Sequence, residues 1–142
     1  SRALASDPSS RQAALAKAAS LLDLNRSAEA LEILLALPVS PEDEPERSTL
    51  LCLAYVREKK GEAAWLAQRD ALTALAGWHV EDPARLARVS EGLLRSSLSL
   101  SRKSRREIAA SVLPAFIRAA DLDPALTGVA LRAAEIALAA SP

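Results

Sequence analysis

The side chains that most often perform catalysis are scarce in this sequence of 142 residues. It contains a single histidine, His79, and a single cysteine, Cys52. One residue of each type is too few for a histidine-rich metal site and makes a cysteine–histidine dyad implausible. No glycine-rich phosphate loop is present, and the acidic pair Asp121 and Asp123 fits helix capping better than acid–base catalysis. We therefore expect a protein that is not an enzyme, with no catalytic residue, no metal ligand and no cofactor.

A basic cluster is the strongest local charge feature, and it consists of Arg102, Lys103, Arg105 and Arg106. It precedes or opens a predicted helix, where the helix dipole makes positive charge mildly unfavourable. An anion or an acidic partner would offset that cost, because helix N-termini and arginine both bind carboxylates and phosphates. The simpler alternative is a solvated loop. The acidic run at residues 42–46 precedes another helix, as the dipole prefers.

Composition limits the classes of partner. The formal net charge is zero and only 3% of the residues are aromatic, so nucleic acid is not an expected partner. No uncharged stretch is long enough for a membrane span. The lone cysteine leaves the compartment open between cytoplasm and periplasm, with the cytoplasm favoured.

The chain contains no methionine, so we expect it to be a processed form or a fragment of a longer protein. Half of its residues are hydrophobic, and alanine and leucine supply most of them. Arginine outnumbers lysine, which together with the alanine content suggests a bacterial gene. The length predicts one domain over residues 1–142.

Helical spacing of apolar residues predicts seven helices and no strand. Their expected ranges are 8–23, 27–37, 45–60, 62–76, 83–98, 105–122 and 124–140. Asn25 should end the first helix, Ser27 should cap the second, and Asp82 followed by proline should open the fifth. Glycine at position 61 should end the third helix. Pro114 should kink the sixth helix.

The helix breakers Asn25 and Gly61 lie 61 − 25 = 36 residues apart, each between two amphipathic runs. A period of this length is typical of stacked helical hairpins, each of which buries its apolar face against the next. The sequence resembles the tetratricopeptide repeat family at several positions. These are Ala18, Leu21, Asn25, Ala30 and Leu34 in the first unit, Leu50, Leu53, Ala54 and Gly61 in the second, and Val112, Phe116, Ala119 and Pro124 in the third. Lys17 and Arg57 depart from the family pattern.

The resemblance implies an all-α, right-handed stack of about three antiparallel hairpins plus a C-terminal helix. In that family the first helix of each hairpin lines a concave groove. The implied partner-binding positions here are Leu15, Ala19, Leu22, Leu51 and Tyr55. Such an apolar groove suits an amphipathic helix of another protein. The alternative is that the leucines only widen the buried face of their helices.

The two tryptophans are expected in different environments, one in the core and one partly exposed. Trp65 lies between Ala64 and Leu66 in the predicted fourth helix and is expected in the core. Trp78 follows a glycine at a helix end and is expected to be partly exposed, as a candidate contact residue.

The predicted last helix is apolar on two sides, which is unusual for the end of a complete repeat array. Leu126, Val129, Ala133 and Ile136 lie on one of these faces. A homodimer through this helix is therefore the alternative to partner binding. The sequence as a whole predicts a scaffold or adaptor that binds another protein, in bacterial assembly, secretion or regulation.

Overall fold

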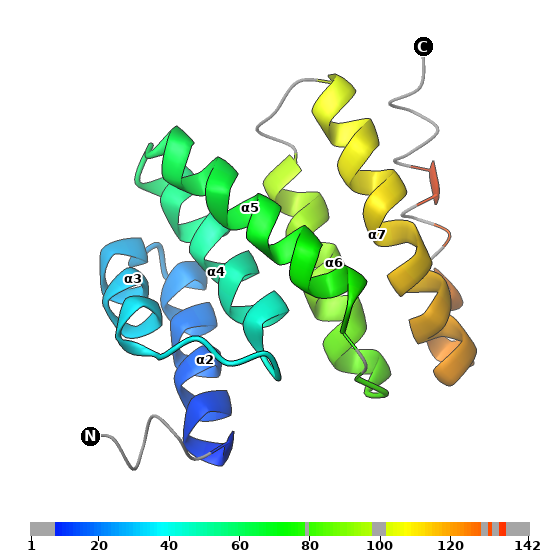
Figure 1. Ribbon diagram of the computed structural model, residues 1–142, viewed down its shortest axis with the longest axis horizontal. Coiled ribbons are helices and arrows are strands. Elements are labelled where there is room, and N and C mark those ends of the chain that lie inside the picture. Colours follow the sequence, from blue (N-terminus) through cyan, green and yellow to red (C-terminus); the bar gives the residue numbers. More distant parts are fainter. Residues whose placement is uncertain (1–7, 79, 98–101, 129–130, 132–133, 136–142) are drawn as a thin grey trace. The chain divides into compact units, whose positions relative to one another are not determined.

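The computed structural model describes residues 8–78, 80–97, 102–128, 131 and 134–135. All regular structure in these residues is helical, which confirms the all-α prediction. The elements are, in chain order, α2 (Pro8–Asp23), α3 (Ser27–Ala36), α4 (Glu44–Arg57), α5 (Gly61–Ala76), α6 (Pro83–Ser97), α7 (Arg102–Leu122) and the short 3-10 helix η1 (Pro124–Leu126) (Figure 1).

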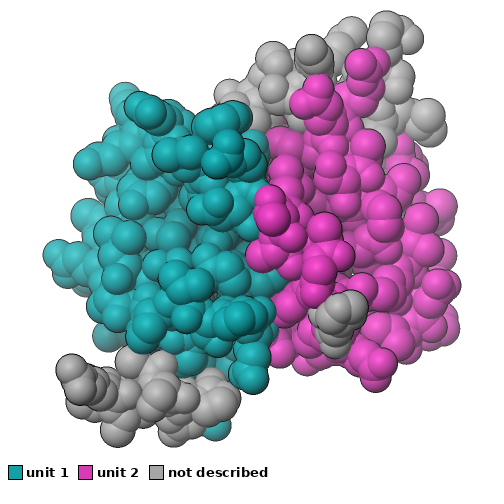
Figure 2. All heavy atoms as spheres, viewed as in Figure 1, with its two compact units in different colours: residues 1–71 teal, residues 72–142 magenta. Residues whose placement is uncertain are grey.

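The chain divides into two compact units, Ser1–Ala71 and Leu72–Pro142, which Figure 2 shows in teal and magenta. The boundary falls inside α5. We refer to these parts as unit 1 and unit 2 and describe each by itself.

In unit 1, helices α2, α3 and α4 contact one another. Residues 24–26 alone connect α2 to α3, and such a short connection makes two packed helices antiparallel. The core of unit 1 also includes the first half of α5. Its buried residues are Leu15, Ala18, Leu21, Leu22, Ala30, Leu34, Leu37, Leu51, Cys52, Ala54, Ala64 and Ala67. Leucine and alanine favour helices and also fill this core, so local preference and packing agree.

Helices α2 and α4 end in the same way. Asn25 and Lys59 follow their helices in the left-handed backbone region, with φ of 61° and 59°. In both turns, this residue and the next donate backbone N–H groups to carbonyls three and five positions earlier, at 2.8 to 3.1 Å. This pair of hydrogen bonds is the Schellman motif, which satisfies carbonyls that a helix end leaves unpaired.

The structure corrects the position of the second helix break. Gly61 is the first residue of α5 and has no positive φ, whereas Lys59 takes the left-handed conformation. The equivalent turns therefore lie 59 − 25 = 34 residues apart, not 36. The two backbone hydrogen bonds of the turn fix this conformation, so a lysine adopts it despite a cost of about 1 kcal/mol.

The predicted cap of α3 is also corrected. Ser27 is the first residue inside the helix, and Arg26 holds the N-cap position without a side-chain capping bond. Arg26 instead pairs with the carboxylate of Glu29 at 2.6 Å. The Ser27 hydroxyl donates to the carboxylate of Glu58, the residue after α4, and so does not cap α3.

In unit 2, α6 packs against α7, and α7 contacts η1. The side chains buried in α6 recur at helical spacing, and so do those in α7; they include Leu86, Val89, Leu93, Ile108, Val112 and Phe116. Asp82 caps α6 as predicted, because its Oδ1 accepts hydrogen bonds from the N–H groups of Ala84 and Arg85 at 3.0 and 3.3 Å.

Two predicted boundaries in unit 2 differ from the structure. Helix α7 begins at Arg102 rather than at residue 105, and it continues past Pro114 to Leu122. The predicted last helix begins as the 3-10 turn η1, capped by Asp123, whose side chain accepts from the N–H of Ala125 at 3.1 Å. Most of its remaining length lies outside the described residues.

Candidate functional site

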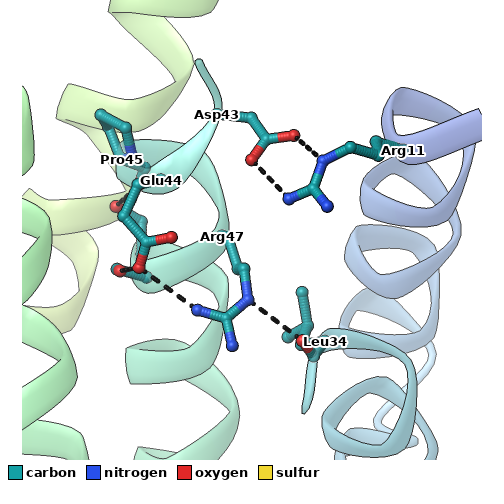
Figure 3. A network of polar contacts seen from close by, with 8 residues as sticks. Arg11, Leu34, Asp43, Glu44, Pro45 and Arg47 are labelled. Carbon is teal, nitrogen blue, oxygen red and sulfur yellow. Dashed lines mark hydrogen bonds and ion pairs between the residues drawn. The ribbon is translucent and has the colours of Figure 1, made fainter. Parts of the chain in front are cut away.

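The start of α4 is joined to α2 by a buried ion pair. Asp43, the residue before α4, accepts two hydrogen bonds from Arg11, Nε to Oδ2 and Nη2 to Oδ1, both at 2.8 Å (Figure 3). Both side chains are at least nine-tenths buried. This bidentate geometry is the strongest that an arginine and a carboxylate can form. It compensates both charges at a place from which water is excluded.

This contact changes the acid–base behaviour of Arg11. The hydrogen bond to Asp43 raises the pKa of the guanidinium above its ordinary value, against the opposing effect of burial. A pKa that is higher in the folded state stabilises that state at every pH below the unfolded value. The stabilisation is lost only as the pH rises through the folded value, in strongly alkaline solution. Since arginine is charged throughout the physiological range in any environment, the ion pair keeps its full stabilising effect there.

A second arginine joins α4 to α3. Arg47 donates from Nε to the backbone oxygen of Leu34 at 3.1 Å and from Nη1 to Glu44 at 3.2 Å (Figure 3). The Ser48 hydroxyl donates to the same oxygen of Glu44 at 2.7 Å. Leu34 lies in the last turn of α3, where carbonyl groups need partners from outside the helix. The backbone oxygen of Leu34 also accepts from the backbone N–H of Leu37 at 3.3 Å, so Arg47 adds a second partner at the end of α3 and links this end to α4.

The C-terminal end of α4 and the residue after it are also hydrogen-bonded to α2 and α3. Arg57 donates to the backbone oxygen of Leu22 near the end of α2. The Ser27 hydroxyl, at the start of α3, donates to the carboxylate of Glu58 at 2.5 Å. Since the starts of α2 and α4 are joined and their ends are joined, the two helices run in the same direction.

These polar groups form hydrogen bonds and ion pairs with one another. Among the described residues, no group of three or more His, Cys, Asp or Glu side chains could hold a metal ion. Cys52 is buried in the core of unit 1, and His79 lies outside the described residues. The hydrogen bonds of Arg11 with Asp43 and of Arg57 with Leu22 hold α2 and α4 side by side.

The predicted partner-binding residues lie on these two helices but differ in exposure. Leu15, Leu22 and Leu51 are buried, with 4%, 4% and 7% of their surface exposed. Ala19 and Tyr55 are half-buried. The three leucines therefore belong to the core of unit 1, and accessible surface remains only at the other two positions.

The basic cluster lies in the first turns of α7. Arg105 and Arg106 are half-buried, and Arg105 Nε is buried with no hydrogen-bond partner among the described residues. The side chains of Arg102 and Lys103 lie outside what the structure describes. Of the residues predicted for oligomer contact, Leu126 is half-buried in η1, while Val129, Ala133 and Ile136 also lie outside.

The two tryptophans occupy the opposite environments from those predicted. Trp65 is 54% exposed, and Trp78 is 6% exposed. The buried residues of α5 in unit 1 are Ala64, Ala67, Gln68 and Ala71, and their side of the helix differs from the one that carries Trp65. Trp78 is held in unit 2 by Arg118, which donates to its backbone oxygen at 2.9 Å, and its ring is covered by Arg85.

Comparison with known proteins gives no match to a family model, a curated protein or a solved structure. Across the described part of the chain, no helix combines the length and apolar character needed to cross a membrane.

Proposed function

We propose that this chain is a non-catalytic scaffold or adaptor, a stack of helical hairpins similar to tetratricopeptide repeats, which binds a partner polypeptide. One observation carries the proposal. Equivalent Schellman turns end α2 and α4 with a spacing of 34 residues, which is the length of a tetratricopeptide repeat.

The hydrogen bonds that join α2 to α4 support the same proposal. In a hairpin stack, the first helices of successive hairpins lie side by side and run in the same direction. Asp43 and Arg57 join α2 to α4 at their two ends in this sense. The face shared by these helices is then the surface offered to a partner, with Ala19 and Tyr55 as its accessible positions.

Because the three predicted leucines are buried, substitutions at them cannot test partner binding separately from folding. An aspartate at Leu51 would put an unpaired charge into the core and unfold unit 1. Tyr55 is half-buried and packs against the edge of the core, so Tyr55→Ala removes contact area and disturbs the fold less than a buried charge would. Leu35→Ala is a matched control, because Leu35 is 57% exposed on α3, the second helix of the first hairpin.

The experiment combines site-specific photo-crosslinking with these variants. A photoreactive amino acid placed at position 19 or 55 should crosslink the same polypeptide in cells, and one at position 35 should not. Tyr55→Ala should reduce the captured amount at position 19 by at least about tenfold, the loss expected for an aromatic contact worth more than about 1.4 kcal/mol. Equal crosslinking at all three positions, or capture unaffected by Tyr55→Ala, would exclude this surface. Circular dichroism checks that each variant is folded.

A further inference from the structure

The outer face of α5 carries the bulkiest exposed apolar side chain of the described residues. Trp65 is 54% exposed, and its neighbour Leu66 is 41% exposed. The guanidinium of Arg69 lies over the indole ring, 5.2 Å from its centroid. Tryptophan and arginine are the residue types most enriched where protein interfaces are energetically strongest. This face therefore has the composition of a contact surface.

Four side chains form one stripe on this face. Glu62, Trp65, Leu66 and Arg69 occupy positions i, i+3, i+4 and i+7 of the helix, which lie together on one side. All four are exposed. The stripe has an apolar centre, a negative charge at its N-terminal end and a positive charge at its C-terminal end. We call it the α5 stripe.

The α5 stripe is complementary to itself. Glu62 precedes Trp65 by three residues, and Arg69 follows Leu66 by three residues. When two copies of the helix are placed antiparallel about a twofold axis between positions 65 and 66, Trp65 faces Leu66 of the second copy. In the same register Glu62 faces Arg69 of the second copy, and symmetry repeats both contacts. A parallel arrangement would place like charges together.

We propose that a second copy of this chain covers the α5 stripe, forming a twofold antiparallel helix pair. Charge complementarity favours a second copy as the occupant, because the stripe carries one charge of each sign and the antiparallel copy places opposite charges against each other. A pair of single helices buries little area, so the dimer is weak and depends on concentration. The interface goes beyond the proposed function, since it uses α5 rather than the face of α2 and α4.

The test is sedimentation equilibrium of the full chain over a concentration series up to about 1 mM. A reversible shift from the mass of 15.0 kDa to twice that mass is expected. Trp65→Ala should raise the dissociation constant by at least about thirtyfold, since the tryptophan is lost from both copies. Leu35→Ala, at an exposed position on α3, should leave the constant unchanged.

Charge reversal tests the antiparallel register. Glu62→Arg and Arg69→Glu should each weaken the dimer by about tenfold, because each turns two attractive pairs into repulsive ones. The double variant restores both pairs and should recover the original constant. Failure of the double variant to recover it would overturn the register. A chain that stays monomeric, or a dimer insensitive to all of these changes, would overturn the interface itself. The crosslinking experiment on positions 19 and 55 is independent of either result.

Discussion

At the scale of single residues, the contacts between Arg11 and Asp43 and between Arg47, Glu44 and Leu34 show how unit 1 carries buried charge. Each arginine has its positive charge compensated by an acid at the start of α4. Such pairs add little net stability compared with apolar packing, but losing one partner leaves an uncompensated buried charge. Their role here is to fix where α4 lies on α2 and α3.

Asp43→Asn should destabilise unit 1 strongly. The substitution preserves the shape of the side chain but leaves the buried charge of Arg11 without its counter-charge. We expect the free energy of unfolding to fall by about 3 kcal/mol, measured by urea denaturation.

The matched control is Glu29→Gln, which removes the acid of an ion pair whose side chains are about half exposed. This change should alter the free energy of unfolding by less than about 0.5 kcal/mol. Similar effects for the two variants would contradict a special role for the buried pair.

At the scale of elements, α2 and α4 end in the same turn with different residues in the left-handed position. Asparagine adopts this conformation readily, whereas lysine is strained in it by its Cβ. The turn after α4 is therefore formed against local preference. It persists because its two hydrogen bonds and the contacts of Arg57 and Glu58 with α2 and α3 determine the chain path.

Lys59→Gly should relieve this strain. We expect it to raise the free energy of unfolding by up to about 0.5 kcal/mol, the difference between the strain removed and the added freedom of the unfolded chain. Asn25→Gly is the comparison, and its effect should be smaller. Urea denaturation of both variants measures the free energy of unfolding. A destabilised Lys59→Gly protein would show that the lysine side chain makes contacts that outweigh the strain.

At the scale of the whole molecule, charge balance is the property that follows most directly from the sequence. The chain carries 18 basic and 18 acidic residues. Without a net charge it lacks the long-range repulsion that keeps protein molecules apart in solution.

Solubility should consequently pass through a minimum near pH 6.6, the isoelectric point. Precipitation by polyethylene glycol, measured at several pH values on both sides of this point, should require the least precipitant there. A solubility that changes in one direction only across the series would be inconsistent with control by net charge. The same series identifies the pH at which weak association through the α5 stripe is best separated from precipitation.

Most of the helices follow from local sequence signals. Alanine and leucine at helical spacing, with Asn25 and Asp82 at helix ends, were sufficient to place α2 at residues 8–23 and to open α6 at Pro83. These signals are local, because each depends on a few neighbouring residues and their backbone hydrogen bonds. The same signals missed the cap of α3, because Ser27 has a partner, Glu58, that lies 31 residues away.

The buried side of each helix depends on how the helix packs against its neighbours. Helix α5 contains so many alanines that its apolar residues surround it, and periodicity could not show that Trp65 faces outward. Packing selected the alanine side, since small side chains allow close approach of neighbouring helices. The contact of Arg11 with Asp43 was equally hidden, because 32 residues separate the two in the chain. The difference has one cause: helix formation depends on neighbours in sequence, whereas burial depends on neighbours in space.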